Sequence, residues 1–333
     1  MNELIIAMDV ENCIPGNYVY LINLGNDFPI DVKCISLTGK SYGIGSEIDI
    51  DSVDRNDIDI VASDNPDSEW FKKFPRAKRI YIHEVDAPRL DLHGHDGRFD
   101  VEIKSQISLN VPDIETIFIP PYQSRGGIMW ESPLPYEERD IDIFFLSSVY
   151  CHVVKSWYEK PCLSPCPNPC PRILNHHRSR VVDIMRKEFG DRFVGGICNN
   201  NITNSDLYHP PVCFEDYKNM MQRAKIAISV SQYRDFSVHS MRETEALMAG
   251  CILVSSPLDV KWSSSPPDSV YFANSDEDFI GVTDTLMGYS LEVQEEIGMK
   301  NRRYIENEYK SQTENFMKAI FGDSWKGRYL ENG

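Results

Sequence analysis

The stretch from Tyr217 to Pro257 reads YKNMMQRAKIAISVSQYRDFSVHSMRETEALMAGCILVSSP. Two short apolar runs within it, Ile226–Val230 and Cys251–Val254, lack helical gaps, as expected of strands buried on both faces. Between them, Arg242–Ala249 is rich in helix-forming residues, and Gly250 ends the helical pattern. Two buried strands joined by a helix form a βαβ unit, and such units build parallel sheets. The stretch therefore predicts an α/β fold.

Polar side chains gather where the helix of this unit begins. The first backbone N–H groups of a helix are unpaired and carry partial positive charge, so they attract an anion such as phosphate. Ser240 is a candidate N-cap, and Glu243 stands at the capping-box spacing from it. Arg242 can form paired hydrogen bonds with phosphate oxygens. Glu245 is suited to accept hydrogen bonds from sugar hydroxyls, so we expect the site to bind a nucleotide-sugar.

The run from Arg242 to Ser255 also resembles the donor-site helix and following strand of GT-B glycosyltransferases. It is most similar to the CgeB-like branch with a glycosyl transferases group 1 type C-terminal domain, and more distantly to exostosin-type enzymes. The resemblance implies that Arg242 faces the donor diphosphate and Glu245 the donor ribose or sugar. Many retaining members carry an earlier Glu, and Ser237 occupies that position here. This departure argues against a retaining mechanism. The alternative is that Arg242 and Glu245 form a solvated pair on a helix surface.

Further candidates for the donor site flank this helix. His239 precedes it and is positioned either to approach the diphosphate or to pack within its loop. Ser147 and Ser148 end the first strand expected in the second domain, where hydroxyls and backbone N–H groups can touch donor phosphates. A simple polar strand end is the alternative interpretation of this serine pair.

The candidate catalytic residues are His83 and Asp86, which follow the predicted strand Arg79–His83. In parallel α/β sheets, ligands bind beyond the carboxyl ends of the strands. An inverting sugar transfer needs a base that takes the proton of the attacking hydroxyl, and either side chain can serve. A surface turn is the alternative interpretation.

A proline-rich insertion at residues 159–178 holds three thiols, Cys162, Cys166 and Cys170. Three thiols can bind zinc, but their spacing is not the usual pair separated by two residues, and the prolines favour an extended loop. We therefore expect a surface insertion with no bound metal. A structural zinc site remains the weaker alternative.

Composition limits the classes of function. The 333 residues are long enough for two domains and carry a net charge of −17, which repels nucleic acid and anionic membranes. Nine cysteines, an odd number, argue against a full disulfide framework. The sequence contains neither a membrane-length apolar run nor a signal-peptide pattern, which predicts a cytoplasmic protein.

Alternating strand and helix patterns predict two α/β domains, the second of them Rossmann-like. The resemblance implies the GT-B arrangement, in which two Rossmann-like domains face each other across a cleft. In the first domain we expect strands at 4–8, 30–37, 58–62, 79–83 and 116–119, and helices at 17–24, 66–74 and 99–109. In the second we expect helices at 179–189, 276–287 and 291–321, with strands at 141–147, 192–195 and 270–272 besides the donor-site unit. The expected divisions are an acceptor-side domain at 1–122, a linker at 123–140, a nucleotide-sugar-binding domain at 141–290 and closing helices at 291–333 that cross back.

The sequence thus predicts a glycosyltransferase that moves a hexosyl or pentosyl group from a nucleotide-sugar to a hydroxyl acceptor. The acceptor class, whether glycan, lipid-linked molecule or protein, stays open, as does the oligomeric state. Because Arg242 and the helix start can stabilise the leaving diphosphate, we expect no required cofactor or metal. Two alternatives are a nucleotide-sugar epimerase on the same fold and a non-catalytic interaction protein with a zinc-binding loop.

Overall fold

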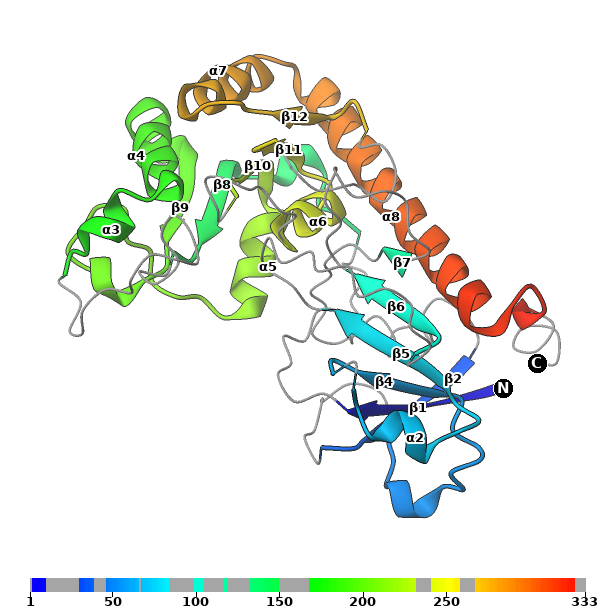
Figure 1. The fold of residues 1–333 in the computed structure, drawn as a ribbon. Coiled ribbons are helices and arrows are strands. Elements are labelled where there is room, and N and C mark those ends of the chain that lie inside the picture. The colour runs from blue at the N-terminus through cyan, green and yellow to red at the C-terminus, as the bar shows by residue number, and fades with distance from the viewer. Residues whose placement is uncertain are drawn as a thin grey trace. The chain divides into compact units, whose positions relative to one another are not determined.

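The computed structural model divides the chain into two compact units, which are described separately (Figure 1). The first unit comprises residues 1–129 and 307–333, and the second comprises residues 130–306. The structure describes residues 2–9, 30–38, 46–65, 67–83, 99–104, 117–118, 132–149, 168–231, 241–257 and 267–326.

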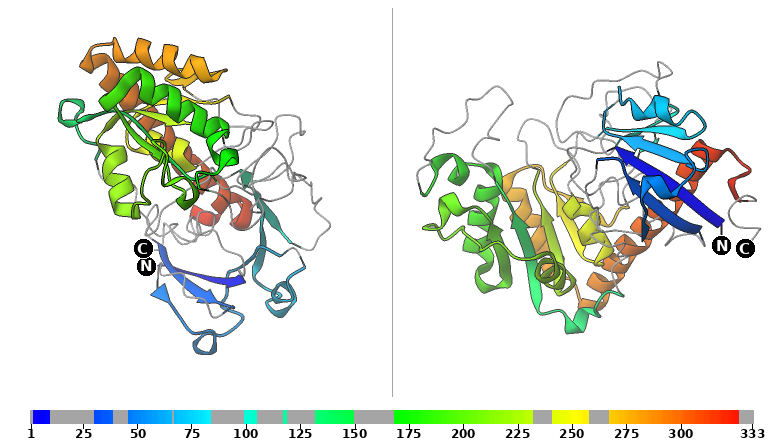
Figure 2. Two further views of the ribbon diagram at one scale, coloured as in Figure 1. Left: turned by 90° about the vertical axis from the view of Figure 1, so that its left-hand side faces the viewer. Right: turned by 90° about the horizontal axis from the view of Figure 1, so that it is seen from below.

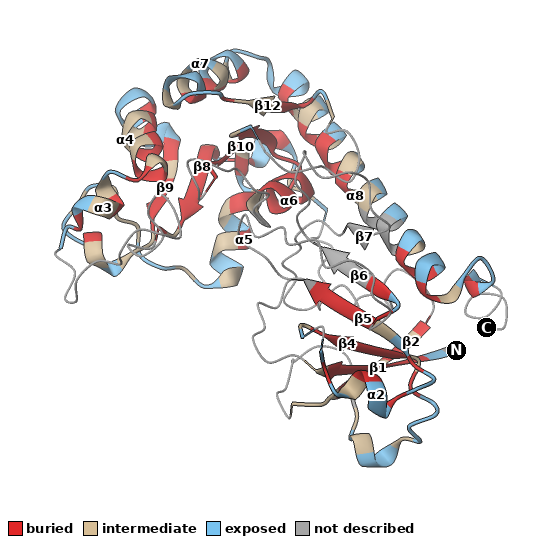
Figure 3. Ribbon diagram, in the orientation of Figure 1, coloured by how far each residue is buried: buried red, intermediate tan, exposed pale blue. Residues whose placement is uncertain are grey.

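The first unit is built on a seven-stranded parallel sheet with the strand order β3-β2-β1-β4-β5-β6-β7. Its strands are β1 (Asn2–Asp9), β2 (Ile30–Ser36), β3 (Ser46–Glu47), β4 (Ile60–Ser63), β5 (Lys78–His83), β6 (Val101–Lys104) and β7 (Ile117–Phe118). The central strands are buried on both faces, which explains why β1 and β4 are continuous apolar runs without alternation. Figure 3 shows this burial along β1, β4 and β5.

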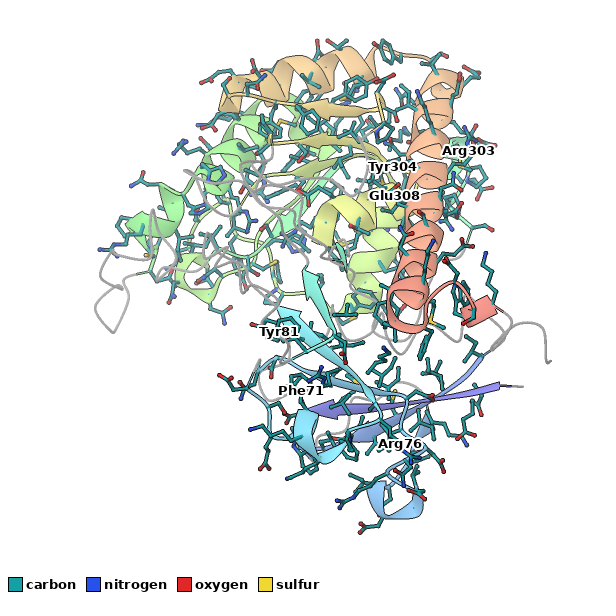
Figure 4. The ribbon with its side chains drawn as sticks, turned by 45° about the vertical axis from the view of Figure 1, so that its right-hand side comes forward. Phe71, Arg76, Tyr81, Arg303, Tyr304 and Glu308 are labelled. Atoms are coloured by element: carbon teal, nitrogen blue, oxygen red, sulfur yellow. The ribbon has the colours of Figure 1, made fainter. Side chains whose placement is uncertain are left out.

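Helix α2 (Trp70–Lys73) covers one face of this sheet. Phe71 and Phe74 pack in a core cluster with Ala7, Val61 and Tyr81, which project from neighbouring strands. Figure 4 labels Phe71 and Tyr81 in this unit. One turn of helix has little stability of its own. Packing of its aromatic side chains, which bury large apolar areas, therefore stabilises α2.

The second unit holds a five-stranded parallel sheet with the order β12-β11-β10-β8-β9. Its strands are β8 (Ile141–Ser147), β9 (Phe193–Ile197), β10 (Ala224–Ser229), β11 (Ile252–Ser255) and β12 (Val270–Phe272). Its helices are α3 (Pro171–Leu174), α4 (His177–Phe189), α5 (Phe214–Gln222), α6 (Met241–Met248), α7 (Asp276–Met287) and the first half of α8 (Leu291–Phe321). Short 3₁₀ helices lie at Tyr136–Glu138, Gly190–Arg192 and Asn200–Ile202 in this unit, and at Ile50–Ser52 in the first unit.

Helices cover both faces of the second sheet (Figure 2). The apolar faces of α4 and α7 meet the sheet in one large core cluster. On the opposite face, the ring of Tyr217 in α5 packs against Phe144 of β8, with 5.8 Å between the ring centroids. A sheet covered by helices on both faces is typical of parallel α/β folds. In such folds, ligands bind at the carboxyl ends of the strands.

Local sequence explains where the helices of this unit begin and end. Ser275 caps α7 by accepting the backbone N–H of Asp278 at 3.1 Å, and three acidic residues follow in the first turn, where negative charge is favourable. Gly250 follows α6 with φ +66°, a conformation that glycine adopts without strain. Both features agree with the helix boundaries expected from the sequence.

One expectation for secondary structure was wrong, and one strand was missed. The helix expected at 99–109 is contradicted by strand β6 at Val101–Lys104, which pairs with β5 on one side and β7 on the other. Pairing with two neighbours outweighed the local helical preference. The missed strand is the short edge strand β3 at Ser46–Glu47. The helix expected at 17–24 lies outside the described residues.

A buried polar cluster ties the segment at 132–140 to the amino end of the second sheet. The guanidinium of Arg139 donates to the carbonyls of Ala224 at 2.6 Å and Ala249 at 2.9 Å. The hydroxyl of Tyr136 donates to the carbonyl of Gly250 at 2.9 Å, and Asn301 of α8 donates to the carbonyl of Cys251 at the same distance. The cluster fixes the amino end of the sheet.

Candidate functional site

The carboxyl edge of the second sheet is the candidate site. The chain leaves β8 toward β9 on one side and returns to β10 on the other, so the strand order reverses between β8 and β10. In open parallel sheets, the loops diverge at such a reversal and leave a crevice where ligands bind. The last residues of the two strands are Ser147 and Ser229, which therefore flank the expected ligand position.

Arg242 in the first turn of α6 reaches this point. Its Nε donates to the carbonyl oxygen of Leu146, near the end of β8, at 2.7 Å. The side chain is half-buried, and Arg242 makes no further hydrogen bond to the residues that the structure describes. One edge of the guanidinium is thus anchored to the sheet. Among the described residues, none uses its Nη atoms, which is the arrangement that an anion-binding guanidinium needs.

Glu245 lies one turn further along α6 and is almost fully buried, with 5% of its surface exposed. The hydroxyl of Tyr217 in α5 donates to its Oε2 at 2.7 Å. Burial raises the pKa of the Glu245 carboxyl to about 7, although the Tyr217 hydrogen bond and the positive charge of Arg242 both favour ionisation. The same burial, together with the charge of Glu245, raises the pKa of Tyr217 well above its ordinary value.

The sequence suggested Glu245 as a ligand for ribose or sugar hydroxyls, and that role stays a prediction. The structure adds that this carboxylate is already held by Tyr217, a partner that the sequence analysis did not single out. Tyr217 lies 28 residues earlier on a different helix. Its only sequence signal is its place four residues before Met221, which is buried on the same face of α5.

Glu243 and the serines are arranged around the same edge. Glu243 is buried and accepts a hydrogen bond from the hydroxyl of Ser229. The hydroxyl of Ser147 donates to the carbonyl of Ser148 at 3.2 Å, and that carbonyl also accepts from Arg178 at 3.0 Å. The predicted phosphate contacts of Ser147 and Ser148 remain predictions, but both residues do lie at the carboxyl edge.

The end of β9 contributes Cys198 to the same neighbourhood. Burial raises the pKa of this thiol, and the positive charge of Arg242 opposes that rise. This charge effect places Arg242 in the electrostatic neighbourhood of the end of β9 as well as in contact with Leu146 of β8. Cys198 is half-buried, and a thiol with a raised pKa is a poor nucleophile, so we assign it no covalent role.

The other candidates are only partly described. Asp86, His239, Ser240, Cys162 and Cys166 lie outside the described residues. His83 is the last residue of β5 and pairs in register with Lys104 of β6, and its side chain is not described.

Cys170 is fully buried and stands at the amino end of α3, where its backbone N–H donates to Asn201. Within the described residues, no group of three His, Cys, Asp or Glu side chains is arranged to hold a metal ion. The same part of the chain contains no helix long and apolar enough to cross a bilayer.

Comparisons with solved structures identify the fold. The chain is similar to Anabaena Alr3699/HepE in complex with UDP and glucose, with a TM-score of 0.57, 9% sequence identity and coverage of 95% of this chain and 98% of that one. A glycosyltransferase from Rickettsia africae ESF-5 gives a TM-score of 0.57 at 12% identity, with 97% and 100% covered. OtsA in its apo form gives 0.56 at 7% identity, with 96% and 99% covered.

These similarities and the two parallel sheets show the GT-B fold of two Rossmann-like domains. No known family profile matches the sequence, and no curated protein matches it. The resemblance to the CgeB-like and exostosin-type branches therefore stays a prediction.

Proposed function

We propose that the protein transfers a sugar from a nucleotide-sugar donor to a hydroxyl acceptor, with the donor bound at the carboxyl edge of the second sheet. The observation that carries this proposal is the position of Arg242. Its guanidinium is anchored on Leu146 at the point where the strand order reverses, and its Nη atoms are not used by the described residues. A cation at this position suits a diphosphate.

The chemistry follows from charge. Breaking the bond between the sugar and the diphosphate leaves negative charge on the leaving group. A fixed guanidinium and the backbone N–H groups at the start of α6 stabilise that charge as it develops. In this proposal, two positive groups of the protein neutralise the diphosphate, and transfer proceeds without a divalent metal.

The remaining roles follow the same proposal. Glu245 and Glu243 connect α6 to its neighbours, because Glu245 accepts a hydrogen bond from Tyr217 of α5 and Glu243 accepts one from Ser229 of β10. His83 and Asp86 in the first unit are the candidates for the base that takes the proton of the acceptor hydroxyl. The similar HepE structure was determined with UDP and glucose, so a UDP-hexose is the first donor to test.

A thermal-shift screen across UDP-, GDP-, ADP- and dTDP-sugars, with and without EDTA, tests the donor site. A ligand that binds only the folded state raises the melting temperature according to its concentration relative to Kd. We expect one nucleotide series to raise it, equally with and without EDTA. Arg242→Ala should remove that rise.

The matched control is Arg223→Ala. Arg223 forms an exposed ion pair with Asp140 at the amino end of the same sheet. This variant should keep the full ligand-induced shift. If no nucleotide-sugar stabilises the wild-type protein, or if Arg242→Ala responds as the wild type does, the proposal is wrong.

A further inference from the structure

The first sheet has its own reversal of strand order. The chain runs from β1 outward to β2 and β3 on one side and then crosses to β4 on the other. The reversal therefore lies between β1 and β4. These strands end at Asp9 and Ser63, and the register of the sheet sets these two residues opposite each other. This is the position in the first unit where a ligand is expected.

Asp9 is held in a defined orientation there. Its Oδ2 accepts a hydrogen bond from the hydroxyl of Ser63 at 3.1 Å and another from the hydroxyl of Ser68. Each serine oxygen in turn accepts a backbone N–H, from Asn65 at 3.0 Å and from Trp70 at 3.3 Å. Because the N–H groups occupy the serine oxygens as acceptors, both hydroxyl protons are directed to Asp9.

The second carboxylate oxygen is not used in this way. Asp9 is half-buried, and its Oδ1 accepts no hydrogen bond from the residues that the structure describes. The serine hydrogen bonds fix the carboxylate through Oδ2 at the reversal of strand order. Its Oδ1 can then accept a hydrogen bond from a hydroxyl or N–H group of a ligand. A purely structural tie between β1 and the start of α2 does not require the reversal position.

The charge of Asp9 selects the class of ligand. A carboxylate accepts hydrogen bonds from hydroxyl groups and repels phosphate, whereas Arg242 in the other unit does the reverse. The reversal points of the two sheets therefore offer opposite chemistries, one suited to an anion and one to neutral hydroxyl groups.

We propose that the carboxyl edge of the first sheet carries a second binding site, in which Asp9, oriented by Ser63 and Ser68, accepts hydrogen bonds from the hydroxyls of an uncharged sugar. The role of that sugar as the acceptor rests on the proposed function. Its binding does not, because Asp9, Ser63 and Ser68 all belong to the first unit and none of them is part of the proposed donor site.

Saturation-transfer NMR with a panel of methyl glycosides (glucoside, galactoside, mannoside and N-acetylglucosaminide) tests the site. The proteins compared are the wild type, Asp9→Asn and the control Asp57→Asn. The asparagine at position 9 can still accept from both serines, so this variant should fold. Asp57 is an exposed aspartate of the same unit. We expect at least one glycoside to bind the wild type and the control, and to bind Asp9→Asn about tenfold more weakly.

Two results would overturn the inference: no glycoside binds the wild type, or Asp9→Asn binds as the wild type does. A lower melting temperature of Asp9→Asn with unchanged glycoside binding would show that Asp9 only ties β1 to the segment before α2. Nucleotide-sugar binding, measured separately, decides the proposed function, so either proposal can fail while the other stands.

Discussion

At the residue scale, Glu245 is subject to opposing influences on its pKa. It is an almost fully buried carboxyl group, yet it lies close to a cation and accepts a hydrogen bond from Tyr217. Desolvation is the larger effect, and it raises the pKa from 4.5 to about 7. The charge next to Arg242 therefore depends on pH in the neutral range. Ionised Glu245 partly neutralises Arg242 and should weaken binding of a diphosphate.

This raised pKa predicts how stability changes with pH. Between pH 4.5 and 7, the folded protein retains a proton on Glu245 that the unfolded chain has released. Unfolding then releases a proton, so the stability contribution of this group falls as pH rises through this window. Glu245→Gln keeps an acceptor for Tyr217 and cannot ionise. Relative to the wild type, it should gain on the order of 3 kcal/mol from pH 4.5 to pH 8.

Urea unfolding of both proteins at several pH values measures this difference. Glu215→Gln is the matched control, because Glu215 is exposed on the helix that carries Tyr217. It should show no such pH-dependent gain. A constant difference between Glu245→Gln and the wild type across the range would show that the carboxyl group titrates normally.

Residues such as Glu245 also show the limit of sequence reasoning. The helix–glycine–strand pattern was enough to predict the helix that carries Arg242 and Glu245. It did not indicate that Glu245 would be buried against Tyr217, because that contact depends on how α5 packs beside α6. Asp9 was not singled out for the same reason, since its two serine partners follow more than fifty residues later.

At the element scale, α8 is fixed by close packing of backbone atoms. A Cβ atom added to Gly298 would overlap the carbonyl oxygen of Gly250 and the hydroxyl of Tyr136. Both groups belong to the buried polar cluster at the amino end of the sheet. Figure 4 shows Tyr304 and Glu308 further along this helix, on the same side and one turn apart.

Gly298→Ala should therefore destabilise the protein. Because the neighbours are backbone and a hydrogen-bonded hydroxyl, they have little room to move, and we expect a loss of about 1–3 kcal/mol. Gly281 in α7 has no atom within 4 Å of an added Cβ, so Gly281→Ala should stabilise by about 0.5–1 kcal/mol. Urea unfolding at pH 7 measures both. Equal effects of the two substitutions would contradict the packing argument.

The elements also show which patterns predict structure well. Helices α7 and α8 begin and end at the expected residues, because a capping serine, acidic first turns and long amphipathic runs act locally. The sequence analysis assigned strand β6 to a helix. Its four residues are too few to distinguish the alternation of a strand from the periodicity of a helix. Its pairing with β5 and β7 decides its conformation. Both neighbours were expected as strands, but the local sequence of β6 does not indicate that it pairs between them.

At the scale of the whole molecule, the two units share one sheet architecture but carry opposite charges at the reversal of strand order, Arg242 in the second unit and Asp9 in the first. Both units are parallel sheets with a reversal of strand order, and polar groups occupy the carboxyl ends at each reversal. The alternation of apolar runs and helices was sufficient to predict two such units. The neighbour order of the strands, which determines where each reversal falls, was not accessible from the sequence, since it is set by crossover connections between distant segments.

The central claim is that Arg242 binds the diphosphate of the donor. Isothermal titration calorimetry with the nucleoside diphosphate of the series that stabilises the protein tests it most directly, on the wild type, Arg242→Lys, Arg242→Ala and the control Arg223→Ala. We predict one site with equal affinity in the wild type and the control, weaker binding in Arg242→Lys, and a loss of about 30-fold in Arg242→Ala. Equal affinity in all four proteins would contradict the account.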